Sequence, residues 1–205
     1  MEIETVIVEF RTYTLHPRTL PEFLKRFEDK LERRLTYSPL AAFWFTEFGP
    51  LNQVIHVWTY KDELERRKIR AQVIADGVWP PNTSEFIAEV KSEIFDPQPI
   101  APALEPGQVG PYFEMRLYTM KPGSVPQMAE RWAEYLPGRT KLSPLVGVFT
   151  FENVWMHIWA YKSLDERMAV RNKAKSEGIW PPPGDSPVVR QESKIMLAAP
   201  FSPIT

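Results

Sequence analysis

The sequence contains no cysteine among its 205 residues. This absence excludes disulfide bonds, thiolate catalysis, cysteine-ligated zinc and iron–sulfur clusters. Long apolar runs are also missing, because no stretch reaches the roughly 18 apolar residues that a membrane-spanning helix needs. Charge of one sign is not in excess either, since 25 lysines and arginines stand against 26 aspartates and glutamates. We therefore expect no nucleic-acid partner and no insertion into a membrane.

Several functional signatures are absent as well. The stretch from Met1 to Thr5 lacks the basic and apolar regions of a signal peptide, so a cytoplasmic location is the expectation. Of the three histidines, two are at equivalent places and none forms a metal-binding spacing such as His-x-x-x-His, so we expect no metal. A glycine-rich phosphate loop and a nucleophile elbow are also missing, and no cofactor is expected.

The sequence does contain one pattern that occurs twice. Three motifs are repeated, namely Glu-x-Arg-x-Tyr, His-x-Trp-x-Tyr and Gly-x-Trp-Pro-Pro. They begin at Glu9 and Glu114, at His56 and His157, and at Gly77 and Gly178. Three motifs that recur in the same order indicate a tandem duplication of one small domain. We expect the first copy over residues 1–97, a Pro/Gly-rich linker over 98–111 and the second copy over 112–205.

Each copy alternates between strand and helix signals. In the first copy, alternation of β-branched and aromatic residues predicts strands over residues 3–15, 40–48, 53–60 and 86–95, the last being an edge strand. An apolar stripe predicts a helix after Thr19, and a charged stretch predicts a second helix after Asp62. The order β-α-β-β-α-β is the signature of a ferredoxin-like α+β domain.

The predicted helix ends carry local signals. Thr19 with Glu22, and Ser124 with Gln127, fit capping boxes at the first helix of each copy. Asp62 and Ser163 are expected to cap the second helices. In the second copy, the stretch Leu136-Pro137-Gly138 is expected to end the first helix early. The i, i+4 pairs Arg66/Arg70 and Arg167/Arg171 are expected on solvated helix faces.

These motifs, together with the Ser-Pro turns at Ser38 and Ser143, resemble the NIPSNAP family over nearly the whole chain, twice. That family belongs to the dimeric α/β-barrel superfamily. The resemblance implies two tandem ferredoxin-like βαββαβ domains whose open sheet faces pack together as a barrel, either within one chain or across a homodimer. Superfamily members include cofactor-independent monooxygenases, small-molecule isomerases and haem enzymes. NIPSNAP proteins have no firmly assigned reaction, and the eukaryotic members are mitochondrial with interaction roles.

The candidate site is a set of polar and aromatic side chains on two strands of each copy. Period-2 geometry places each strand's members on one side. Val8, Phe10, Ile55 and Val57 are expected to face the helices, so we expect the polar sets to face the barrel interior. The sets are Glu9, Arg11, Tyr13, His56, Trp58 and Tyr60 in the first copy, and Glu114, Arg116, Tyr118, His157, Trp159 and Tyr161 in the second.

Such a set suits a small-molecule pocket inside the barrel. Histidine is the candidate general base, arginine can hold a carboxylate or oxyanion, and tyrosine can donate to developing charge. The candidate catalytic residues are therefore His56, His157, Tyr13 and Tyr118, with the remaining members binding ligand. Trp79 and Trp180 either pack against the fold or form a lid.

Three alternatives to small-molecule binding remain open. The polar set can be structural, because buried Glu–Arg pairs and core histidines commonly satisfy one another. The chain can be a non-catalytic protein-interaction module, as the charged second helices allow. It can also be a haem protein with His56 or His157 as the axial ligand.

Overall fold

The computed structural model describes residues 6–205, and both copies follow the order β-α-β-β-α-β. The first copy comprises β1 (Ile7–Leu15), α1 (Leu20–Leu35), β2 (Leu40–Phe48), β3 (Gln53–Tyr60), α2 (Glu63–Ala75) and β4 (Ile87–Pro97). The second comprises β5 (Tyr112–Met120), α3 (Val125–Thr140), β6 (Leu145–Phe151), β7 (Val154–Tyr161), α4 (Leu164–Ser176) and β8 (Val188–Ala198). The ferredoxin-like α+β prediction is confirmed, while the predicted strand residues 3–5 lie outside the described part.

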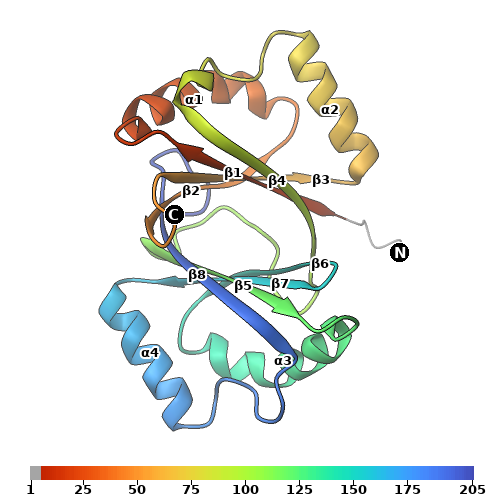
Figure 1. Ribbon diagram of the computed structural model, residues 1–205, viewed down its shortest axis with the longest axis vertical. Helices are drawn as coiled ribbons and strands as arrows, with labels where there is room; N and C mark the ends of the chain where they lie inside the picture. The colour runs from red at the N-terminus through yellow and green to blue at the C-terminus, as the bar shows by residue number, and fades with distance from the viewer. Residues whose placement is uncertain (1–5) are drawn as a thin grey trace.

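All eight strands belong to one closed barrel in the order β1-β3-β2-β8-β5-β7-β6-β4. Figure 1 shows the two sheets facing each other, with a pair of helices on the outer side of each. The last strand of each copy crosses to the other copy, so that β8 pairs with β2 and β4 pairs with β6. The two copies therefore complete the barrel within a single chain.

The prediction that residues 86–95 form an edge strand is wrong. β4 pairs with β1 along its length, and its end pairs with β6 through Asp96 opposite Thr150 and Pro97 opposite Phe149. The strand runs two residues further than its alternating pattern, which brings it to the second copy. Closure of the barrel removes the unpaired edges that an open ferredoxin-like sheet would leave.

The helix starts agree with the sequence only in part. At α2, Asp62 accepts a hydrogen bond from the Glu65 amide at 2.7 Å, and Ser163 caps α4 in the same way at 3.0 Å, as predicted. The capping boxes predicted for α1 and α3 are wrong. The Thr19 and Ser124 hydroxyls instead donate to backbone carbonyls three residues before them. Both residues already have helical backbone angles, which turn the hydroxyl back toward the preceding turn.

Helix α3 continues through Pro137 to Thr140, so the predicted early end is wrong. A proline in a helix interior costs about 3 kcal/mol because it removes a backbone donor. The turn beyond it is anchored by Arg139, which is buried and donates to Ser143 Oγ at 2.7 Å and to Tyr161 Oη at 3.0 Å. These tertiary contacts override the local preference.

Apolar side chains from both copies fill the barrel interior. Strand residues of the two sheets form one buried cluster that includes Val8, Phe10, Ile55, Val57, Phe113, Met115 and Ile158. Leu104 and Val109 of the linker and Ile204 near the C-terminus pack against the same cluster. Figure 1 shows the linker running between the two sheets. Backbone hydrogen bonds between Gly107 and the segment 203–205 hold it there.

The opposite face of each sheet packs against the helices and carries the polar and aromatic sets. Trp58 and Tyr60 cluster with Phe23, Phe27 and Leu31 of the first copy, and Trp159 and Tyr161 cluster with Trp132 of α3. The prediction that these sets face the barrel interior is therefore wrong. An eight-stranded barrel is only wide enough for side chains to fill, and two facing sheets offer few partners for charged groups. The helices supply those partners.

None of the helices within residues 6–205 is both long and apolar enough to cross a bilayer. The two helices that cover each sheet are amphipathic or strongly charged, as Glu63, Glu65 and Arg66 in the first turns of α2 illustrate. Their buried faces meet the sheet, and it is between sheet and helices that the polar sets lie.

Candidate functional site

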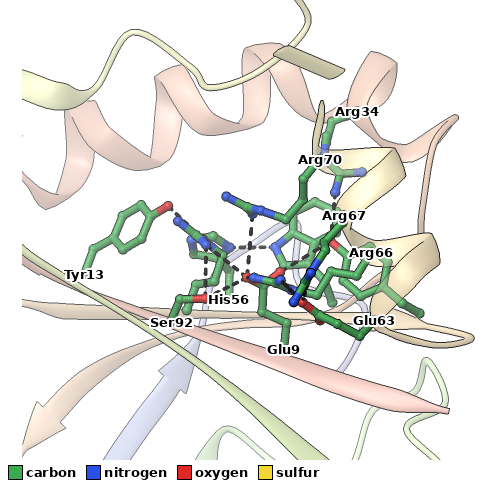
Figure 2. Close-up of polar contacts among 12 residues, drawn as sticks. Glu9, Tyr13, Arg34, His56, Glu63, Arg66, Arg67, Arg70 and Ser92 are labelled. Carbon is green, nitrogen blue, oxygen red and sulfur yellow. Dashed lines mark hydrogen bonds and ion pairs between the residues drawn. The ribbon is translucent and has the colours of Figure 1, made fainter. Parts of the chain in front are cut away.

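A buried carboxylate lies at the centre of the polar set in the first copy. Glu9 is fully buried, and its Oε1 accepts hydrogen bonds from Arg66 at 2.7 Å, Ser92 at 2.7 Å and Arg11 at 3.0 Å. Arg70 lies 3.6 Å from the same oxygen. Figure 2 shows Arg66 and Arg70 of α2 and Ser92 of β4 beside Glu9, and Arg11 comes from β1 as Glu9 does. One carboxylate thus organises groups from three elements.

The second copy repeats this arrangement around Glu114. Its Oε1 accepts from Arg167 at 2.6 Å, Ser193 at 3.0 Å and Arg116 at 3.0 Å, and its Oε2 lies 3.7 Å from Arg171. The prediction that the α2 and α4 arginines lie on solvated helix faces is therefore wrong for Arg66 and Arg167. The side chains of Arg66 and Arg167 are only 14% and 20% exposed.

Both carboxylates are held in the ionised form. Burial opposes ionisation of Glu9, but hydrogen bonds from Arg66 and Ser92 and the charges of Arg70 and Arg11 outweigh it and lower the pKa to about 2. For Glu114, burial is likewise outweighed by Arg167 and its neighbouring guanidiniums, which lower the pKa to about 2. Both carboxylates are therefore ionised near neutral pH and compensate the charge of the arginines around them.

A fourth arginine in each copy has a different environment. Arg34 donates to Ser38 Oγ at 2.9 Å and Tyr60 Oη at 3.2 Å, and its guanidinium lies 4.1 Å from the centre of a Trp58 ring. Arg139 makes the equivalent contacts, and neither pairs with a carboxylate of residues 6–205. Burial lowers the pKa of both guanidiniums. Each is a buried cation held by neutral groups.

Sequence reasoning missed these two arginines. The signal was present as an Arg-x-x-x-Ser spacing before each Ser-Pro turn, from Arg34 to Ser38 and from Arg139 to Ser143. Each serine lies three residues beyond the end of its helix, and the turn that follows the helix brings the two side chains within hydrogen-bonding distance. The spacing occurs at the same place in both copies, as the three longer motifs do.

His56 and His157 are buried and their rings are oriented by tryptophan. The Nδ1 atom of His56 accepts from Trp58 Nε1 at 2.7 Å, and that of His157 accepts from Trp159 Nε1 at 2.8 Å. Burial, followed by the nearby guanidinium of Arg11 or Arg116, keeps the pKa of each histidine well below its usual range. The neutral ring carries its proton on Nε2, so no basic nitrogen is left free for proton abstraction.

Two equivalent cavities open between the sheet and the helices. The cavity in the first copy has a volume of about 230 Å³ and that in the second about 220 Å³. Each is lined by three arginines, a tyrosine and a Trp–Pro pair joined by a cis peptide bond. These are Arg11, Arg34, Arg70, Tyr13 and Trp79–Pro80 in the first copy, and Arg116, Arg139, Arg171, Tyr118 and Trp180–Pro181 in the second.

The predicted site residues divide into two groups around these cavities. Arg11, Tyr13, Arg116, Tyr118, Trp159 and Tyr161 line a cavity, whereas Glu9, Glu114, His56, His157, Trp58 and Tyr60 lie in the packed layer beside it. A haem does not fit, because neither histidine reaches a cavity wall. Both cavities are also smaller than the roughly 300–1,000 Å³ of pockets for drug-sized ligands.

Positive charge exceeds negative charge around each cavity. In the second copy, four guanidiniums stand near the single buried carboxylate Glu114. In the first copy, Glu63 adds a second carboxylate at 3.2 Å from Arg66, at the exposed edge. Within residues 6–205, no three His, Cys, Asp or Glu side chains are grouped so as to hold a metal ion. The lining of each cavity is therefore predominantly cationic.

The sequence is similar to that of known proteins over nearly its whole length. The NIPSNAP family model matches residues 8–102 and 113–203. The human protein NipSnap homolog 3A is 28% identical over 218 residues, covering 99% of this chain and 87% of its own length. Mouse NipSnap homolog 3B is 31% identical over 176 residues, covering 80% and 70%.

A solved structure from Lactobacillus acidophilus shares the fold alone, with 9% identity, a TM-score of 0.63, and coverage of 95% of this chain and 94% of its own. The double match of the family model agrees with the duplicated strand–helix order and with the two equivalent arginine cavities. The chain belongs to the NIPSNAP family.

Proposed function

We propose that the protein binds small anionic molecules in the two equivalent cavities between sheet and helices. The observation that supports this most directly is the convergence of three arginines on each cavity beside one buried carboxylate. Guanidinium groups bind carboxylate and phosphate oxygens with two parallel hydrogen bonds. A small carboxylate or inorganic phosphate matches both the charge and the volume of the site.

Each lining residue has a distinct part in this proposal. The side chain of Arg70 is 30% exposed. Its Nη1 lies 3.6 Å from Glu9 Oε1, which is too far for a hydrogen bond, so its donors are available to a ligand. The Tyr13 hydroxyl accepts from Arg11 Nε at 3.0 Å, which leaves its own proton for donation to the anion. Trp79 packs edge-on against Phe27 and Trp58 and offers an apolar wall.

Glu9 acts as a positioning residue in this site. It holds Arg11, which lines the cavity, and Arg66, which lies beside it, in fixed orientations, so Arg11 needs little reordering when an anion enters. Glu114 does the same for Arg116 and Arg167. Both cavities are enclosed by a helix and the Trp–Pro loop, which suits a small molecule rather than a nucleic-acid backbone.

Titration calorimetry with benzoate and with inorganic phosphate tests the proposal. We expect two anion sites per chain. Loss of a charge-assisted contact is worth about 1.5–3 kcal/mol. Arg70→Gln should therefore weaken the first site about tenfold or more, and the Arg70→Gln/Arg171→Gln double variant should weaken both.

Matched controls come from the same helices. Arg67 is 74% exposed and pairs with Glu63, and Lys173 is exposed in the last turn of α4, yet neither lines a cavity. Arg67→Gln and Lys173→Gln should bind both probes as the unaltered protein does. The proposal fails if the double variant retains the original affinity, or if the unaltered protein binds neither probe.

A further inference from the structure

A third cavity, of about 180 Å³, lies inside the barrel and is separate from the two arginine cavities. Its apolar wall is formed by barrel-interior residues that include Phe10, Phe95, Met115 and Met156. Its polar rim comes mainly from β4 and β8, the strands that close the barrel. A small molecule with an apolar part would find in it both an apolar surface and polar groups, the usual composition of a ligand site.

The charges on this rim are reversed between the two copies. Lys91 and Glu93 on β4 correspond to Glu192 and Lys194 on β8. The strand registers support this correspondence. Lys91 is opposite Thr12 of β1, and Glu192 is opposite Leu117 of β5, the equivalent position in the second copy. All four residues line the cavity. The rim therefore carries two positive and two negative charges that face one another.

Both rim carboxylates already have cationic partners. Glu93 pairs with Lys91 at 2.9 Å, and Glu192 pairs with Arg190 at 3.0 Å. Lys194 is left without an ion pair to any carboxylate of residues 6–205, and its Nζ donates to Gln53 Oε1 at 3.0 Å. The amine is thus positioned by a neutral amide at the polar rim of the cavity, beside its apolar wall.

The surroundings of Lys194 shift its amine toward the neutral form relative to an exposed lysine. Burial lowers the pKa of the amine, and the positive charge of Lys91 lowers it further, while Glu192 and Glu93 act in the opposite direction more weakly. A neutral amine is a nucleophile, whereas a protonated one is not. The position of Lys194 in the cavity and the charges around it therefore both favour a nucleophilic amine.

We infer that Lys194 is the reactive amine of a barrel site that takes small apolar aldehydes or ketones. The Nζ lone pair attacks the carbonyl carbon, a C–N bond forms, and the carbonyl oxygen leaves as water. The two hydrogens of that water come from the neutral amine, and nothing is oxidised or reduced. The apolar part of the substrate packs against Phe10 and Met115, and the Gln53 amide holds the nitrogen in place.

Reductive trapping on the full chain tests this inference. The protein is incubated at pH 7 with butanal and cyanoborohydride, and alkylated lysines are quantified by peptide mass spectrometry. Each unit by which a pKa is lowered gives about tenfold more neutral amine. We therefore expect Lys194 to be labelled faster than Lys141, which is exposed and lies outside the cavity.

Two comparisons identify the cause of any selective labelling. Lys194→Arg should abolish the fast site and leave the Lys141 rate unchanged. Glyoxylate, an aldehyde that carries a carboxylate, should show a smaller ratio of Lys194 to Lys141 labelling than butanal, because the wall is apolar. Equal labelling of the two lysines by butanal, or a larger ratio with glyoxylate, would overturn the inference.

Discussion

Replacing Glu9 with glutamine is expected to destabilise the protein by about 3–5 kcal/mol, the range for breaking a buried ion pair by removing one partner. The carboxylate accepts hydrogen bonds from Arg66, Ser92 and Arg11 while fully buried. A glutamine keeps the shape but removes the charge that compensates several guanidiniums. It also presents amide donors where donors already converge. Repulsion among the guanidiniums is then opposed by Glu63 at the exposed edge and no longer by the buried carboxylate.

Urea denaturation at pH 7 measures this effect. Glu114→Gln serves as an internal replicate, since Glu114 has the equivalent set of partners. Glu89→Gln is the matched control, because Glu89 is exposed on β4 and should change the free energy of unfolding by less than about 0.5 kcal/mol. A loss below about 1 kcal/mol for Glu9→Gln would show that the surrounding arginines do not depend on the carboxylate.

The sequence was sufficient to predict the fold for a physical reason. Strand and helix periodicities are local, and the duplication provided each of them twice, as the paired His-x-Trp-x-Tyr strands beginning at His56 and His157 show. Pairing of β1 with β3 follows from the ferredoxin-like order. The residue pattern did not predict that β4 would also pair with the second copy. That pairing with β6 involves only the last residues of β4.

The orientation of the candidate site was not predictable from strand patterns alone. Alternation shows that Val57 and Trp58 point to opposite faces, but it does not say which face meets the helices. Both faces turn out to be buried here. What decides the outcome is the location of partners for Glu9, and those partners are arginines on α2 that resembled a solvated helix face. Whether a charged helix packs beside a buried carboxylate depends on the tertiary structure, which the alternation along a strand does not encode.

Acidification is expected to remove a further large part of the stability. The pKa values of Glu9 and Glu114 fall from a reference of 4.5 to about 2 on folding. A depressed carboxylate pKa stabilises the fold fully above pH 4.5, and the contribution is lost as the pH falls toward 2. Linkage gives a loss of about 2 kcal/mol per carboxylate between pH 7 and pH 3. Urea titrations at a series of pH values measure it.

Two buried histidines also contribute to this acid sensitivity. The pKa of His56 and that of His157 lie well below 6.5 in the folded protein, so their unfolded forms take up protons first as the pH falls. Their destabilising contribution begins near pH 6.5 and precedes that of the carboxylates. The slope of stability against pH therefore combines four groups, and a single curve cannot assign it to Glu9.

The difference between the unaltered protein and Glu9→Gln isolates the carboxylate. The histidines and Glu114 titrate in both proteins, so their contributions largely cancel in that difference. Protonated Glu9 is uncharged, as glutamine is, and the gap between the two proteins should narrow by about 2 kcal/mol from pH 7 to pH 3. A gap that stays constant over this range would mean that folding does not lower the pKa of Glu9. The three arginines paired with Glu9 would then stabilise its ionised form no more than water does.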